Sequence, residues 1–185
     1  MPDKDALYFI AVIPQKEVYD EIIAIKNDFA ERFDSKKALN VMPHITLKAP
    51  FRFSVTEHKI LVQWFYNLYI KENSFDIELK NFGAFNKRKG AVVYVEPVMN
   101  MFLYSLQSEI IRSIKNSFPT CIDNTDVKFK PHMTVAYRDL TNEKFREAWK
   151  EYKTKEYHAL FHVDSFHLLQ HDKKRWNVIE TYQLK

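Results

Sequence analysis

The sequence predicts an α+β or mixed α/β fold that contains two related halves. Segments with the period of a strand alternate with segments with the period of a helix, and the closing segments are typical of antiparallel hairpins. The pattern Pro, His, apolar, Thr, apolar occurs twice, at residues 43–47 and 131–135, each time after a helical segment. This repetition indicates that the chain holds two similar units.

The composition limits the protein to a few classes. The 185 residues, 46% apolar and 28% charged, are typical of one globular domain, so we expect residues 1–185 to form a single unit. The 2 glycines are too few for a GxGxxG motif or a P-loop, which excludes nucleotide binding of those two kinds. The single cysteine, Cys121, excludes an internal disulfide or a zinc ribbon.

The charge and the apolar segments indicate the surroundings of the protein. Lys and Arg total 28 and Asp and Glu total 24, and the net charge of +4 favours phosphate-bearing partners. The first apolar run ends at Pro14, and no uncharged run approaches the roughly 18 residues of a membrane span. We therefore expect a cytoplasmic monomer that does not associate with membranes.

The first quarter of the chain predicts a strand, a helix and a second strand. A β-branched and aromatic run predicts a strand over residues 7–13, which Pro14 ends. A helix is expected from about residue 15 to 34, and a strand from about 41 to 48. One apolar stripe follows the helix at steps of three and four: Val18, Ile22, Ile25, Phe29 and Phe33.

The middle of the chain predicts a helix and a hairpin. Ser54 followed by Glu57 resembles a capping box that opens a helix. The expected buried face of this helix consists of Ile60, Leu61, Trp64, Phe65 and Leu68. Strand patterns at 75–79 and 91–95 then predict a hairpin whose tip, NKRKG, carries three basic residues.

The remaining elements follow the same kinds of signal. Asn100 is placed to cap a helix that Pro119 ends. Its expected buried face consists of Leu103, Leu106, Ile110, Ile114 and Phe118. We further expect a strand over 127–137, a charged helix over 142–152, and two strands near 159–169 and 176–184.

The repeated motif puts a histidine and a threonine on one face of each strand. Residues i and i+2 of a strand point to the same side, so His44 and Thr46 share a face, as do His132 and Thr134. Two histidines facing one phosphorus atom can serve as base and acid in phosphodiester cleavage. Threonine hydroxyls can donate to the non-bridging oxygens, so this chemistry needs no metal ion and no cofactor.

Three other residues are candidates for substrate contact. Lys48 and Arg138 lie four and six residues after the two histidines, and these even offsets put them on the same face while the strands stay regular. Phe85 borders the basic NKRKG tip and could stack on a base. Alternatively, Lys48 and Arg138 are charges exposed to solvent at strand ends, and Phe85 packs in the core.

Two rival signals carry less information. His158 with His162, and His167 with His171, have the spacing of metal ligands on a helix, but their surroundings are typical of strands. No convincing third ligand accompanies them, so no metal site is predicted. Cys121 has no nearby base and is not expected to be a nucleophile.

The segments PHITLKAPF and PHMTVAYRDL resemble the two signature strands of the 2H phosphoesterase superfamily, in its 2'-5' RNA ligase-like or cyclic phosphodiesterase branch. The resemblance extends along nearly all of the chain and implies two pseudo-symmetric lobes, each an antiparallel sheet flanked by helices, around a central cleft. It further implies metal-independent hydrolysis of 2',3'-cyclic phosphates or 2',5'-linked phosphodiesters at RNA ends or in nucleotides, with reversible ligation as a further activity. By this resemblance, the catalytic residues are His44, Thr46, His132 and Thr134.

The sequence departs from the family pattern in two places. Relatives often have an arginine shortly after the second motif, whereas here Tyr137 comes first and Arg138 follows. A serine near the closing strand is replaced around Gln170 or His171. These departures leave the substrate open. The two motifs are nearly symmetric, which leaves the assignment of acid and base open. A non-catalytic module that binds RNA ends or nucleotides is the alternative function.

Overall fold

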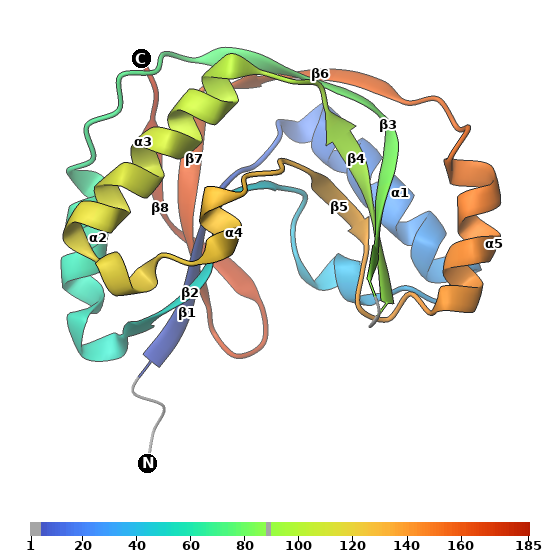
Figure 1. The fold of residues 1–185 in the computed structure, drawn as a ribbon, viewed down its shortest axis with the longest axis horizontal. Helices are drawn as coiled ribbons and strands as arrows, with labels where there is room; N and C mark the ends of the chain where they lie inside the picture. Colours follow the sequence, from blue (N-terminus) through green and yellow to red (C-terminus); the bar gives the residue numbers. More distant parts are fainter. Residues whose placement is uncertain (1–4, 88–89) are drawn as a thin grey trace.

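The computed structural model describes residues 5–87 and 90–185, which form eight strands in one curled antiparallel sheet of order β6-β3-β4-β5-β2-β1-β7-β8 (Figure 1). The strands are β1 (Asp5–Val12), β2 (Ile45–Ser54), β3 (Phe75–Lys87), β4 (Gly90–Pro97), β5 (Met133–Ala136), β6 (His158–Val163), β7 (Ser165–His171) and β8 (Trp176–Gln183). The helices are α1 (Lys16–Arg32), α2 (His58–Tyr66), α3 (Met101–Ser117), α4 (Asn124–Val127) and α5 (Asn142–Tyr152). Short 3-10 segments lie at Lys37–Asn40 (η1), Val55–Glu57 (η2) and Pro119–Cys121 (η3).

The sheet consists of two halves that mirror each other in strand order. One half contains β2, β1, β7 and β8, and the other contains β5, β4, β3 and β6. Figure 1 shows α2 and α3 beside β7 and β8, and α1 and α5 on the side of β3 and β4. The expected α+β fold with two pseudo-symmetric lobes is confirmed, with one difference. The lobes share a continuous sheet, because β2 and β5 pair with each other at its centre.

Most of the helices begin and end where their sequence signals predict. Val18, Ile22 and Phe29 of α1 are buried, and so is the following Phe33. The side chain of Asn100 caps α3 by accepting a hydrogen bond from the backbone N–H of Leu103 at 3.1 Å. The charged helix over 142–152 coincides with α5.

Some boundaries differ from the prediction. Ser54 caps the short segment η2 rather than α2 itself, and Ile60 is 55% exposed. The expected strand at 127–137 is wrong at both ends, since β5 contains only residues 133–136. Val127 instead ends α4, which begins with a capping box between Asp123 and Asp126. The predicted hairpin at 75–95 is confirmed as β3 and β4, and residues 88–89 of its NKRKG tip lie outside the described residues.

The expected strand over 159–169 is two strands, which is the largest correction to the fold. The chain leaves β6 at Val163 and enters β7 at Ser165, so only Asp164 separates them. The strand β6 pairs with β3 at one edge of the sheet, whereas β7 lies between β1 and β8 in the other half. Both strands have similar alternating patterns, and therefore periodicity alone cannot reveal the crossing.

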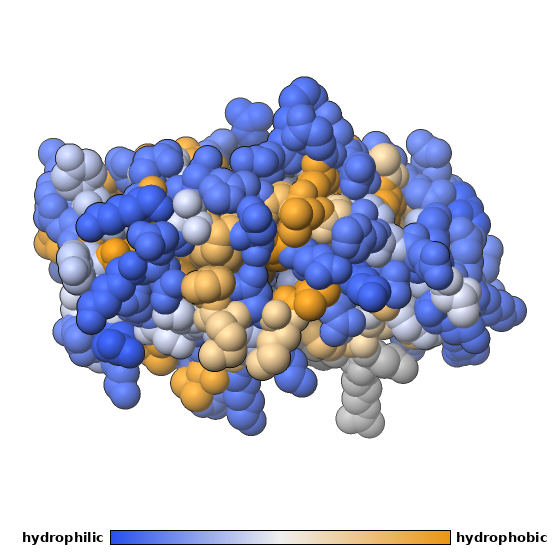
Figure 2. Space-filling view, turned by 90° about the horizontal axis from the view of Figure 1, so that it is seen from above, coloured by the Kyte–Doolittle hydropathy of each residue, from blue (hydrophilic) through white to orange (hydrophobic). Residues whose placement is uncertain are grey.

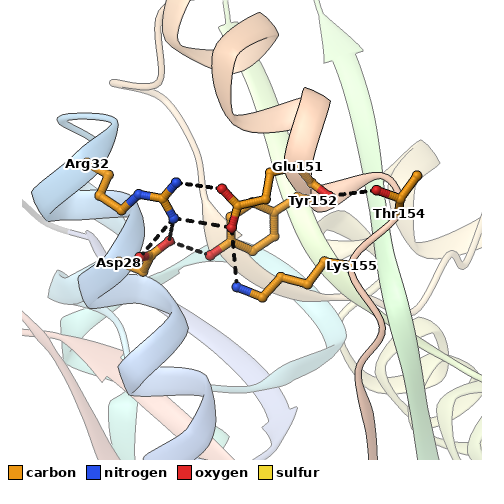
Figure 3. Close-up of polar contacts among 6 residues, drawn as sticks. All are labelled: Asp28, Arg32, Glu151, Tyr152, Thr154 and Lys155. Atoms are coloured by element: carbon orange, nitrogen blue, oxygen red, sulfur yellow. Dashed lines mark hydrogen bonds and ion pairs between the residues drawn. The ribbon is translucent and has the colours of Figure 1, made fainter.

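A polar cluster fixes the end of α1 against α5 (Figure 3). Tyr152 Oη donates to Asp28 Oδ2 at 2.6 Å, and Arg32 binds both Asp28 and Glu151. The ion pairs are partly exposed and contribute little each, but Tyr152 is buried against Phe29, which anchors the cluster. The cluster also fixes the position of Lys26, which is on α1 and lines the pocket described below.

Hydrophilic residues cover most of the face drawn in Figure 2. Figure 2 shows apolar groups between hydrophilic ones on the face seen from above. Exposed apolar side chains include Met101 and Phe102 at the beginning of α3. Within residues 5–87 and 90–185, no helix has the length and apolar character that a membrane crossing requires.

Candidate active site

The two motif strands meet at the centre of the sheet. Ile45 of β2 pairs with Met133 of β5, and both side chains are buried in the core. Ile45 and Met133 are the first residues of β2 and β5. If the alternation of side chains is continued by one residue before each strand, the residues on either side of this pair share the opposite face. These are the four polar residues of the repeated motif: His44, Thr46, His132 and Thr134.

The antiparallel register sets the arrangement of these four side chains. Continuing the Ile45–Met133 pairing by one residue in each direction puts His44 opposite Thr134 and Thr46 opposite His132. Each histidine thus faces a threonine, and the two histidines occupy diagonal corners. Diagonal residues in such a pair lie about 7–8 Å apart, which leaves room for a phosphate group between two imidazoles.

Each imidazole is oriented by the same backbone contact. Nδ1 of His44 lies 2.7 Å from the carbonyl oxygen of Met42, and Nδ1 of His132 lies 2.8 Å from that of Lys130. A carbonyl oxygen only accepts hydrogen bonds, so Nδ1 carries the hydrogen in both rings. In neutral His44, Nε2 is therefore the atom that can accept a proton.

Aromatic rings hold both histidines from the side. Phe9 packs against His44 with ring centroids 5.0 Å apart. Phe85 and Tyr94 contact His132 edge-on at 5.2 and 5.5 Å. Phe85 thus lies beside the predicted site, but as a neighbour of a histidine. Its role as a stacking surface for a base stays a prediction.

Gly83 makes room for one of these rings. The Tyr94 ring lies directly over Gly83, so a Cβ atom there would overlap it. We expect Gly83→Ala to lower the free energy of unfolding by about 1–3 kcal/mol and to displace Tyr94 from His132, which would also reduce activity. Thermal unfolding and turnover check this. The substitution should cost little in a Tyr94→Val background, and an equal cost there would contradict the overlap.

The environment of His44 favours its neutral form. The pKa of His44 is lowered from 6.5 to about 4, chiefly by burial; the hydrogen bond to Met42 opposes the shift, and the positive charges of Lys26 and His132 add to it. His44 is therefore neutral near pH 7 and can accept a proton. The desolvation of His44 depends on its packed surroundings and was not predictable from the sequence.

A pocket of about 520 Å³ opens in front of the motif strands. His44, Thr46 and Thr134 line it, whereas His132 is not among its lining residues. The wall also contains Lys26, Lys37, Arg138, Lys174, His171 and Trp176. Among the described residues of the wall there are four Lys or Arg and no carboxylate, so the pocket suits an anion.

A bulge follows each motif and reverses the alternation of side chains. Thr46 and Lys48 pair with consecutive residues of β1, and Thr134 and Ala136 pair with consecutive residues of β4. Residues 47 and 135 are thus the extra residues of two equivalent bulges. Directly after the bulges, Lys48 and Ala136, four residues after the two histidines, are buried instead of facing the site.

The bulge removes Lys48 from the site and corrects the prediction of substrate contact there. Lys48 and Asp126 form an ion pair at 3.0 Å in which both side chains are 0% exposed. Lys48 Nζ also donates to the carbonyl oxygen of Ala49 at 2.8 Å. The parity argument was wrong because it assumed a regular strand, and Lys48 is a core residue.

Arg138 reaches the pocket by a different route. It follows β5, has a left-handed φ of 64°, and its guanidinium carbon lies 5.3 Å from the centre of the Tyr137 ring. Both residues line the pocket. A bulge and a left-handed residue, rather than a regular strand, thus precede the position of Arg138 at the pocket, and its role in substrate contact stays a prediction.

Sequence reasoning missed several residues of the wall, notably Lys26, Lys37, Lys174 and Trp176. Lys26 had a usable signal. It follows Ile22 by four residues and precedes Phe29 by three, so it occupies a place in the apolar stripe of α1. A lysine at such a position is unusual enough to mark a functional candidate.

Of the rival histidines, His171 lines the pocket, whereas His158 and His162 lie elsewhere. His158 pairs with Glu78 at 3.0 Å, and His162 pairs with Asp76 at 2.7 Å, on the exposed side of β6. No group of three possible metal ligands forms within the residues that the structure describes. Burial raises the pKa of Cys121, which makes its thiol a poorer nucleophile.

Comparisons with known proteins identify the family. A model described as the 2'-5' RNA ligase superfamily matches residues 14–175. A protein named "Putative phosphoesterase" from Geobacillus sp. (strain WCH70) is 28% identical over 176 residues, covering 95% of this chain and 94% of the relative.

Two solved structures have a similar fold. The protein TT0787 of Thermus thermophilus has a TM-score of 0.68 at 18% identity, covering 96% of this chain and 97% of that one. E. coli LigT complexed with 3'-AMP has a TM-score of 0.69 at 18% identity, covering 98% of this chain and 99% of that one.

Proposed function

Since the chain belongs to the 2'-5' RNA ligase superfamily of 2H phosphoesterases, we propose that it is a metal-independent phosphodiesterase that acts on 2',3'-cyclic phosphates or 2',5'-linked ends of RNA and nucleotides. One observation carries the proposal: the Ile45–Met133 pairing gathers two histidines and two threonines on one face, beside a cationic pocket. The complexes of E. coli LigT with 3'-AMP, ATP and NADP+ support a nucleotide as ligand.

The proposed reaction divides proton transfer between the histidines. Neutral His44 takes a proton from water through Nε2 while the water oxygen bonds to phosphorus. His132 gives a proton to the leaving 2'- or 3'-oxygen as its bond to phosphorus breaks. The hydroxyls of Thr46 and Thr134 donate to the non-bridging oxygens, whose charge must be stabilised in the transition state. The low pKa of His44 is the reason for naming it as the base.

A substrate panel tests the proposal. Cyclic mononucleotides, short RNAs with cyclic ends and 2',5'-linked dimers are incubated with the protein in excess chelator. Hydrolysis in chelator is the expected result. Binding without turnover of any member would instead favour a module that only holds nucleotides, and activity that disappears with chelator would point to a metal mechanism. Ligation, a cytoplasmic location and a monomeric state stay predictions from the sequence.

The pH profile tests the assignment of His44 as the base. A base must be unprotonated in the free enzyme, and the pKa of His44 is lowered to about 4, so kcat/KM is expected to persist below pH 6.5 and to fall only as His44 protonates near pH 4. Initial rates over the acidic range, with the fold followed by circular dichroism, measure this limb. An acidic limb near the ordinary histidine value of 6.5 would contradict the assignment.

A further inference from the structure

A buried ammonium group in the pocket wall contacts a backbone carbonyl rather than a carboxylate. Lys26 of α1 is 2% exposed and lines the same pocket as His44. Its Nζ donates to the carbonyl oxygen of Val41 at 2.7 Å, which uses one of its three hydrogens. No salt bridge joins Lys26 to a carboxylate within residues 5–87 and 90–185.

Carboxylates on nearby elements bind other groups. Asp28, on the same helix, accepts hydrogen bonds from Tyr152 and Arg32 (Figure 3). Asp139, which follows Arg138, accepts from the hydroxyl of Ser35 and from two backbone N–H groups. Within the part of the chain that the structure describes, the positive charge of Lys26 therefore has no paired negative charge.

An uncompensated buried charge is costly, which makes Lys26 unusual as a structural residue. Burial lowers the pKa of Lys26 to about 8, so most molecules still carry the charge at neutral pH. Lys48, the other fully buried lysine named above, has Asp126 as a partner. The contrast indicates that the counterion of Lys26 arrives with a ligand.

We propose that Lys26 is a substrate-binding residue whose ammonium group takes a phosphate oxygen of the ligand as its counterion. The identity of that ligand as a substrate rests on the proposed function. The oxygen belongs either to the phosphate that is cleaved or to a second phosphate of the same molecule. Lys37, Arg138 and Lys174 line the same wall, and together with Lys26 they exceed the single charge of one cyclic phosphate.

Phosphate binding can be measured without turnover. Inorganic phosphate is titrated into wild type, Lys26→Met and Lys26→Arg, with binding followed by calorimetry. We expect Lys26→Met to weaken phosphate binding about tenfold or more, because it removes a charge-assisted hydrogen bond. Lys26→Arg keeps the charge and should retain part of the affinity. Lys16→Met is the matched control, since Lys16 is on the same helix but is exposed and pairs with Asp20. It should bind phosphate as wild type does.

Thermal unfolding separates binding from a structural role. Without phosphate, Lys26→Met is expected to unfold at the same or a higher temperature than wild type, since it replaces a buried charge by an apolar side chain of similar length. It should also lose the stabilisation that phosphate gives to wild type. A lower unfolding temperature with unchanged phosphate affinity would overturn the proposal. Lys26 would then be a structural residue that stabilises the backbone at Val41.

The comparison of substrates distinguishes the two phosphates. KM is compared for 2',3'-cyclic AMP with and without a 5'-phosphate. A rise in KM for both in Lys26→Met assigns Lys26 to the cleaved phosphate, and a rise only for the 5'-phosphorylated form assigns it to the second phosphate. Unchanged KM values for both in an active variant would overturn the inference while the proposed function stands. If the protein binds phosphate through Lys26 but hydrolyses no substrate, the inference stands and the proposed function fails.

Discussion

His44→Ala and His132→Ala are each expected to lower the turnover of a 2',3'-cyclic nucleotide by about 10²- to 10⁴-fold, the usual contribution of a general acid or base. The loss should appear in kcat more than in KM, because proton transfer acts in the transition state. Nδ1 of each ring bonds to a carbonyl only two residues earlier in the chain, so both variants should fold. Steady-state kinetics in chelator measure the effect.

A matched histidine elsewhere provides the control. His158 lies on β6, is exposed and pairs with Glu78, so His158→Ala should leave turnover unchanged. The two motif variants should also differ in their pH profiles. His44→Ala should remove the acidic limb near pH 4, because that limb reports the protonation of His44. Wild-type turnover in both folded variants would exclude the two-histidine mechanism and favour a binding module.

Lys48→Met is expected to lower the free energy of unfolding by about 3–5 kcal/mol, because it leaves the carboxylate of Asp126 buried without its partner. Asp126 also accepts hydrogen bonds from the backbone of Ala49 and Asp123, and so its charge helps to join β2 to α4. Molecules that remain folded should keep the KM of wild type, since Lys48 does not line the pocket. Chemical denaturation and kinetics check the two halves of this prediction.

The control uses an exposed ion pair. Lys16→Met breaks the Lys16–Asp20 pair on the surface of α1 and should cost about 1 kcal/mol or less. Combining Lys48→Met with Asp126→Asn should cost less than the sum of the single changes, because the second substitution removes the unpaired charge. If Lys48→Met instead raises KM strongly and leaves the free energy of unfolding unchanged, Lys48 contacts the substrate and this prediction is wrong.

Local signals were sufficient for much of the fold. The apolar stripe of α1, the Asn100 cap of α3 and the limits of α5 depend on contacts within a few residues, which periodicity and capping chemistry describe well. The pairing of strands that are distant in the chain could not be predicted from these local signals. The break at Asp164 sends two similar strands to different halves of the sheet, a decision made by partners far away in the chain.

The amino-acid sequence by itself determined that two histidines and two threonines recur in equivalent strands, because the spacing of a motif and the alternation of a strand are local properties. The tertiary structure decided what surrounds them. The bulge after the first motif turned Lys48 into the core, and helix α1 brought Lys26 into the pocket. The pairing of distant strands and the desolvation of individual side chains depend on the packed molecule, and no single segment contains that information.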